Sequence, residues 1–270
     1  MPWIQTCILI VFAQGFSAAD AQPPTFDIVP LGPTDVEHTR NDGYRNSYIL
    51  GYGEGGEVAG GANRYNGGAS YLGQTTWLYN GAGTINIGLT DVEHTRNDGY
   101  RASLPTTQLN ASGQVAGFAY RFNGGSSDLG LSAWLFNGAS TINIGPIDVE
   151  HTRSDGYRRS ITTTQLNELG QVAGRAERYN GGATFLGQSA WLYNGTSTIN
   201  IGLSDAEHTR NDGYQLSATL TQVNEAGQVA GYSRRYNGGA FDLGTSIWIY
   251  NGASTINIGL SDAEHTRNDG

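Results

Sequence analysis

The chain contains no lysine: all 15 of its basic residues are arginine, against 24 acidic residues, and the formal net charge is −9. A negative surface without lysine argues against binding of a nucleic-acid backbone and against docking on an anionic membrane. Proline is also scarce, with 7 residues, whereas glycine supplies 40. So much glycine suits a chain in which many tight turns join short strands. We therefore expect an all-β protein.

Cysteine is limited to Cys7, which lies in a short N-terminal apolar run over residues 7–13. This run is too short to span a bilayer. It is followed by the small-residue pattern Ala-Asp-Ala that ends at Ala21, as in a secretory signal. We expect residues 1–21 to be a signal peptide, and the mature chain to be secreted, extracellular or periplasmic. Cleavage would remove the only cysteine, so no disulfide or thiolate chemistry is expected.

The sequence is organised by an internal repeat. The segment Glu-His-Thr-Arg, followed by Asn or Ser and then Asp-Gly, recurs with spacings of 56, 57, 57 and 57 between its histidines, which are His38, His94, His151, His208 and His265. One tryptophan recurs every 57 residues, at Trp77, Trp134, Trp191 and Trp248. A fixed period predicts a repeat architecture. We expect a single repeat domain, 26–270, with units 34–89, 90–146, 147–203 and 204–260 and a truncated fifth unit 261–270, and we interpret the four tryptophans as structural core.

Each unit contains four segments with strand character. In the third unit they are 157–166, 171–179, 189–193 and 197–202. Asn180-Gly181 is a strong hairpin signal because both residues tolerate positive φ, and no segment has helical periodicity. A repeated four-stranded antiparallel meander is typical of a propeller blade.

Four complete blades follow one orphan strand. Residues 26–32 occupy the position that an outer strand fills in the later units. The predicted fold is a β-propeller of four blades plus this strand, either closed as a ring or part of a larger one. A linear β-solenoid is the structural alternative.

The repeated sequence resembles the bacterial extracellular HAF-type repeat. The resemblance rests on the run Val-Asn-Glu-Ala-Gly-Gln-Val-Ala-Gly at 223–231, the strand Ser-Ile-Trp-Ile-Tyr-Asn-Gly at 246–252 and Ile-Asn-Ile-Gly at 256–259, with counterparts in all four units. The histidine of the family's His-Ala-Phe-Leu-Trp strand is absent, and the Glu-His-Thr-Arg segment is no part of its pattern. The resemblance implies an extracellular, propeller-like protein of unassigned activity.

Two polar motifs are expected to meet at one end of each blade. In an antiparallel blade, the turn between the second and third strands and the connection to the next blade emerge on the same side. The candidate ligand-binding residues at this end are Glu93, His94, Arg96, Asp98, Arg121, Glu150, His151, Arg153, Asp155, Arg178, Tyr179, Glu207, His208, Arg210, Asp212, Arg235 and Tyr236. Arginine and carboxylate groups can hydrogen-bond sugar hydroxyls, and tyrosine adds flat apolar contact. The same groups can instead form an internal network that ties one blade to the next.

Metal and catalytic sites are not predicted. Asp35, Glu37, His38, Asn41 and Asp42 offer oxygen and nitrogen ligands, and the Asn-Asp-Gly turn could present oxygens to calcium. Their spacing does not match an EF-hand loop, however, and zinc would need more than one nearby histidine. Catalysis needs an asymmetric pair of groups, whereas here the acids recur in every unit. We therefore predict no enzyme activity, no metal and no cofactor.

The predicted function is recognition of a glycan or an extracellular protein surface through the Glu-His-Thr-Arg side, with the oligomeric state left open. The alternative is a structural cell-surface array without a small ligand.

Overall fold

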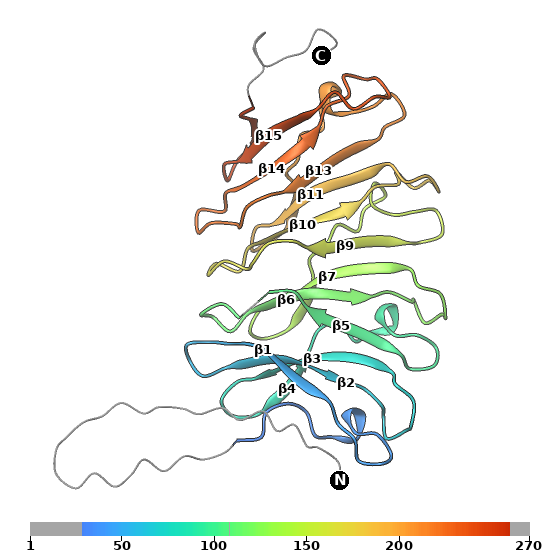
Figure 1. Cartoon of the computed structure of the whole chain (residues 1–270), viewed down its shortest axis with the longest axis vertical. Coiled ribbons are helices and arrows are strands. Elements are labelled where there is room, and N and C mark those ends of the chain that lie inside the picture. The colour runs from blue at the N-terminus through green and yellow to red at the C-terminus, as the bar shows by residue number, and fades with distance from the viewer. Residues whose placement is uncertain (1–28, 108, 260–270) are drawn as a thin grey trace, which may run out of the picture.

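The computed structural model describes residues 29–107 and 109–259, and the chain is all-β. Its strands form one 16-stranded mixed sheet made of four antiparallel groups of four strands, and these groups stack as blades along the longest axis of the molecule (Figure 1). Within the described residues no helix is long and apolar enough to cross a membrane. The predicted signal peptide and the truncated fifth unit lie outside the described residues.

The four blades follow the chain in order, and each lies inside one predicted repeat unit. The first has strands β1 Ser47–Tyr52, β2 Val58–Asn63, β3 Gly73–Tyr79 and β4 Thr84–Ile87, and the second has β5 Arg101–Pro105, β6 Val115–Tyr120, β7 Gly130–Phe136 and β8 Thr141–Asn143. The third has β9 Arg158–Thr162, β10 Val172–Glu177, β11 Gly187–Tyr193 and β12 Thr198–Asn200, and the fourth has β13 Gln215–Thr219, β14 Val229–Arg234, β15 Thr245–Tyr250 and β16 Thr255–Asn257.

Turn chemistry sets the strand boundaries in the third blade. Asn180 and Gly181 have φ values of 49° and 74°, so the predicted Asn-Gly turn is confirmed, although it lies within a longer connection, 178–186, between β10 and β11. The first strand is shorter than the predicted 157–166. It ends at Thr162 because the next two backbone amides, of Thr163 and Thr164, both donate to the carbonyl of Ala173, which breaks the ladder.

A short connection leads into each blade. Three of the four connections form single 3-10 turns, η1 Val36–His38, η2 Val92–His94 and η3 Ala206–His208. Each begins after an aspartate whose side chain accepts a hydrogen bond from the backbone N–H of the histidine. This is ordinary N-capping, which satisfies a backbone donor that would otherwise lack a partner.

The tryptophans fill the space between blades. Trp134 packs against Leu78 and Ile87 of the first blade and Val115 of its own, and Trp191 and Trp248 occupy the same place at the next two junctions. All four indoles are at most 1% exposed. Burial of a side chain of this size stabilises the fold by roughly 2–3 kcal/mol, so the tryptophan series is a main part of the core.

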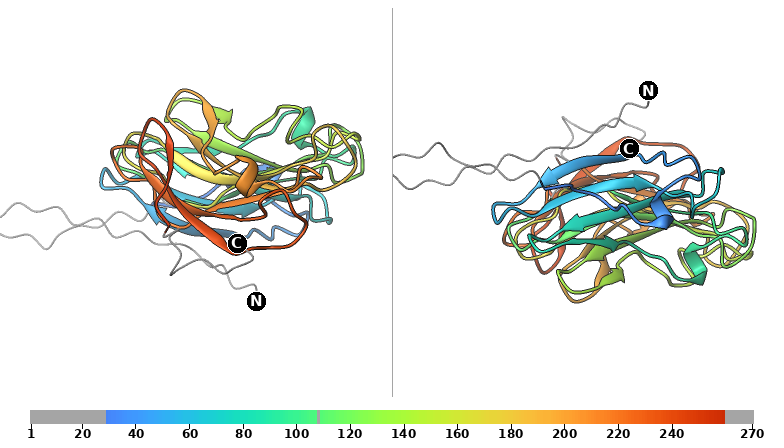
Figure 2. Two further views of the ribbon diagram at one scale, coloured as in Figure 1. Left: turned by 90° about the horizontal axis from the view of Figure 1, so that it is seen from above. Right: turned by 90° about the horizontal axis from the view of Figure 1, so that it is seen from below.

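Neighbouring blades are also joined through their backbones. The first residues of β3 pair in parallel with those of β5, as do β7 with β9 and β11 with β13. Strand pairing runs from β1 to β16 and, within the described residues, does not return to β1. The blades therefore form an open stack, which the end views in Figure 2 show along its axis.

The predicted orphan strand is not formed over the part that the structure describes. Residues Val29–Gly32 have no strand assignment, and the rest of the segment lies outside the described residues. Pro30 lacks a backbone donor for a ladder. Leu31 nevertheless packs against Trp77 and covers the outer side of the first blade.

Candidate recognition face

Each connection contacts the turn between the second and third strands of its own blade. The backbone amides of Phe122 and Asn123 donate to the carbonyl of Glu93 at 2.7 and 2.9 Å. The carbonyls of Glu37, Glu150 and Glu207 accept the equivalent pair of bonds. The predicted meeting of the two polar motifs is therefore present in all four blades. We call this side of the stack the connection end; it comprises the connections 35–45, 91–101, 148–158 and 205–215 and the turns 64–72, 121–129, 178–186 and 235–243.

The histidines are buried beneath the connection end. His151 is 1% exposed, and its Nδ1 lies 2.7 Å from Oδ1 of Asp148 while its Nε2 lies 2.9 Å from the hydroxyl of Ser189 on β11. His208 makes the equivalent contacts with Asp205 and Ser246. These side chains link a connection to the third strand of the same blade.

The glutamates link one blade to the next. Oε1 of Glu93 accepts from Nε of Arg121 at 2.8 Å and from Nη2 of Arg158, which belongs to the following blade, at 2.5 Å. Burial and the nearby charge of Arg121 lower the pKa of Arg158, while Glu93 opposes that change. The same arrangement joins Glu37, Arg64 and Arg101 at the first junction.

The remaining predicted arginines and aspartates pair within their own turns. Nε and Nη2 of Arg96 donate to the two carboxylate oxygens of Asp98 at 2.8 and 2.5 Å. This pairing, together with the backbone N–H of Tyr100, lowers the pKa of Asp98 to about 2. The Arg96 guanidinium also lies over the ring of Tyr100, 4.6 Å from its centroid. Arg153 with Asp155 repeats the bidentate pairing, and Arg210 donates to Asp212 at 2.7 Å.

Aromatic side chains form two ladders along the connection end. In the first, Tyr44, Tyr65, Tyr71, Tyr100 and Phe122 meet edge to face with successive centroid separations of 6.0, 6.3, 6.3 and 5.7 Å. In the second, Tyr157, Tyr179, Phe185, Tyr214 and Tyr236 meet with separations of 5.9, 6.1, 6.2 and 5.8 Å. We call these sets the first and second aromatic ladders. Each crosses one blade junction.

One position explains why there are two ladders. Tyr71 and Phe185 occupy equivalent places in the first and third blades, before the Leu-Gly that opens the third strand, where the second and fourth blades have Asp128 and Asp242. At the junction between the second and third blades, Asp128 therefore stands where an aromatic ring would continue the series.

The repeat pattern did not single out the exposed members of the ladders. Tyr71 and Phe185 are 48% and 44% exposed, whereas the predicted Tyr179 and Tyr236 are only 5% and 6% exposed. Partial burial raises the pKa of Tyr71 to about 12, so its phenol is neutral at physiological pH. The available signal was the alternation of aromatic and acidic residues at this one position of the repeat.

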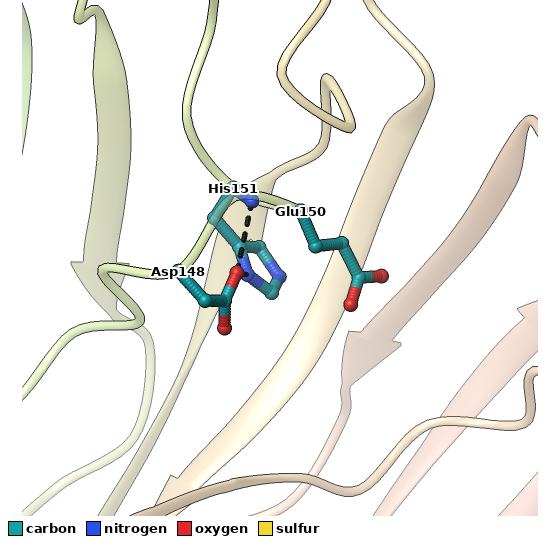
Figure 3. A group of neighbouring side chains, drawn as sticks. All are labelled: Asp148, Glu150 and His151. Carbon is teal, nitrogen blue, oxygen red and sulfur yellow. Dashed lines mark hydrogen bonds and ion pairs between the residues drawn. The ribbon is translucent and has the colours of Figure 1, made fainter.

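A metal site is not favoured by the side-chain geometry. Ligand atoms of Asp148, Glu150 and His151 lie within 4.8 Å of one another, as do those of the equivalent residues 205, 207 and 208. Figure 3 shows Asp148 and Glu150 directed to different sides of the His151 ring. Both ring nitrogens of His151 already have hydrogen-bonding partners. A metal would have to displace one of them.

Comparisons with known proteins give only remote structural likenesses. No family model matches, and no curated protein matches. A Pyrococcus horikoshii acylaminoacyl peptidase is similar with a TM-score of 0.43 at 8% identity, over 79% of this chain and 26% of that one. The Aleuria aurantia lectin AAL has a TM-score of 0.31 at 11% identity over 81% and 65%, and a Kordia zhangzhouensis fucose lectin has 0.29 at 12% over 59% and 100%. Likenesses this distant do not bear on function, and membership of the HAF-type repeat family stays a prediction.

Proposed function

We propose that this chain is a non-catalytic recognition protein that binds glycans at the connection end, through the exposed rings of the two aromatic ladders and the Arg–Asp pairs beside them. The observation that carries the proposal is the pair of ladders, in which partly exposed rings lie beside arginines that are paired with aspartates. We expect the partners to be extracellular.

The chemistry of the ladders suits a polyhydroxylated ligand. A sugar ring presents apolar C–H groups that pack on an aromatic face, and hydroxyls that hydrogen-bond to charged groups at its edge. Tyr71 offers a half-exposed ring next to Tyr100, whose turn carries the Arg96–Asp98 pair. Because the second ladder repeats this arrangement around Phe185, a long glycan that reaches both would bind with avidity.

We also propose that the chain has no catalytic activity at the connection end. The repeated glutamates are engaged by buried arginines, since Arg121 and Arg178 are each 5% exposed. A carboxylate whose oxygen already accepts hydrogen bonds from a buried guanidinium is not free to contact a substrate. This use of the acids supports a binding role.

A purely structural array is the second candidate. The buried histidines and the Glu93–Arg158 link are internal contacts, which supports a bracing role for much of the Glu-His-Thr-Arg segment. Such a brace is compatible with binding by the exposed rings, because the two roles use different side chains of the same segments.

A glycan-array screen on residues 22–270, repeated with EDTA, tests the proposal. We expect saturable binding to a defined glycan that EDTA does not remove.

The double variant Tyr71→Ala, Phe185→Ala should weaken that binding about tenfold or more, at about 1 kcal/mol per stacked ring. Tyr52→Ala is the matched control, because Tyr52 is 77% exposed at the end of β1 that lies away from the connection end. Silence across the array, or equal loss in both variants, would leave the structural array as the better account.

A further inference from the structure

One blade junction lacks a guanidinium that the two preceding junctions contain. Arg101 and Arg158 place Nη2 2.5 Å from Oε1 of Glu37 and Glu93, respectively. The equivalent residue in the fourth blade is Gln215, opposite Glu150. Its amide nitrogen turns elsewhere and donates to Oγ1 of Thr209 at 2.6 Å and to the carbonyl of Ser204 at 3.2 Å.

A pocket lies at this junction. Its volume is about 280 Å³, and its lining includes Glu150, Arg178, Ser189, Asn200, Gln215 and Ser217. The three positions that form the Glu–Arg–Arg link at the earlier junctions thus all border the pocket. Among the described residues, Oε1 of Glu150 accepts from Arg178 alone, at 2.7 Å, so this carboxylate has one charged donor where Glu93 has two.

We propose that this pocket between the third and fourth blades binds an alkylguanidinium group, which takes the place that Arg158 occupies at the preceding junction. The ligand would be either a free guanidinium compound or an arginine side chain of a partner. This inference does not depend on the glycan proposal, because it uses other residues and another ligand chemistry.

The charges at the site are compatible with a bound cation. Arg178 would lie near the ligand, just as Arg121 lies near Arg158 at the preceding junction, and there one carboxylate accepts from both guanidinium groups. The planar guanidinium fits a carboxylate better than an ammonium does, because its N–H donors diverge in a fixed fork. Ser189 and Ser217 also line the pocket, where their hydroxyl groups are hydrogen-bonded to His151 and Ser233, respectively.

The test is an NMR titration of residues 22–270 with ethylguanidinium, using ethylammonium at equal ionic strength as the control. We expect saturable shifts of the Gln215 and Ser217 amide resonances with ethylguanidinium only. Gln215→Arg should fill the pocket and abolish the shifts.

Arg158→Gln should open an equivalent site at the preceding junction and raise the stoichiometry from one to two. Glu150→Gln should weaken binding about tenfold or more, through loss of the charge-assisted bond.

The relative affinities of two ligands identify the source of the guanidinium group, and the controls show whether the site exists. Tighter binding of N-acetylarginine amide than of ethylguanidinium would identify an arginine side chain as the source, and the reverse order would identify a free guanidinium compound. The proposal would be overturned by any of three results. These are shifts that persist unchanged in Gln215→Arg, an equal response to ethylammonium, and the lack of any saturable shift.

Discussion

The indole of Trp191 on β11 lies directly over Gly174, its cross-strand partner on β10. A Cβ placed on Gly174 would lie 2.2 Å from Cζ2 of Trp191 and 2.1 Å from the carbonyl oxygen of Ile161. The same contact recurs between Gly60 and Trp77, and at 117 and 134 and at 231 and 248. The tryptophan and the glycine are therefore one packing unit, repeated once per blade.

Gly174→Ala should lower the free energy of unfolding by about 1–3 kcal/mol or more, because the added methyl group meets both a rigid ring and a backbone carbonyl. Urea denaturation followed by tryptophan fluorescence measures the change. Gly83→Ala is the matched control, since a Cβ there would have no neighbour within 4 Å. Equal midpoints for the two variants would contradict this account of the repeat.

The buried histidines should contribute to stability whether or not a ligand binds nearby. Replacing His94, His151 and His208 together with alanine removes buried side chains that hydrogen-bond to their capping aspartates. We expect the free energy of unfolding to fall by at least about 1 kcal/mol per site. The double variant Val92→Ala, Val149→Ala changes the same segments at positions that are 72% and 73% exposed, and it should be nearly neutral. Unchanged stability in the triple variant, together with lost glycan binding, would instead assign the histidines to the binding site.

The acid titration of Asp98 should depend on Arg96. The pairing lowers the pKa of Asp98 from 3.8 to about 2 in the folded chain. Its contribution to stability is therefore present above the unfolded value of 3.8 and is lost as the pH falls through about 2. In Arg96→Gln, carboxyl NMR should show the pKa of Asp98 returning towards its ordinary value. Asp42, which is paired in the same way with Arg40, serves as an internal control and should titrate as before. A low pKa for Asp98 that persists in the variant would mean that Arg96 is not its cause.

The sequence predicted those features of the fold that depend on the repeat period and on the backbone conformation of single residues. The period of the tryptophans predicted the blades, and Asn180-Gly181 predicted a turn between β10 and β11, because few other residues adopt two successive positive φ values. The end of β9 was not predictable in this way, because the bonds of Thr163 and Thr164 to Ala173 depend on how the chain leaves the sheet.

Side-chain pairing was harder to predict than position. The sequence correctly predicted that Glu93, Arg96 and Asp98 lie at the connection end, but it did not predict which residues they pair with. Glu93 pairs across a blade junction with Arg158, 65 residues away, whereas Arg96 pairs with a residue in its own turn. The repeat could reveal only that the same groups recur; which of them face solvent is decided by packing between blades.

The gap between the two aromatic ladders makes a final prediction. Asp128→Tyr places a ring at the junction between the second and third blades. Tyr71 and Phe185 provide the equivalent ring at the junctions before and after it. The lost hydrogen bond from the backbone N–H of Gly130 to Asp128, 2.7 Å long, should be tolerated, because the first and third blades have an aromatic residue in its place. A joined series of rings should bind a long glycan about tenfold more tightly than the wild type while leaving short oligosaccharides unaffected. Titration calorimetry with both lengths of the glycan identified on the array measures this difference. Asp242→Tyr is the control, since it adds the same ring beyond the second ladder and bridges nothing; an equal gain from both variants would show that added aromatic area, and not continuity between the ladders, sets the affinity.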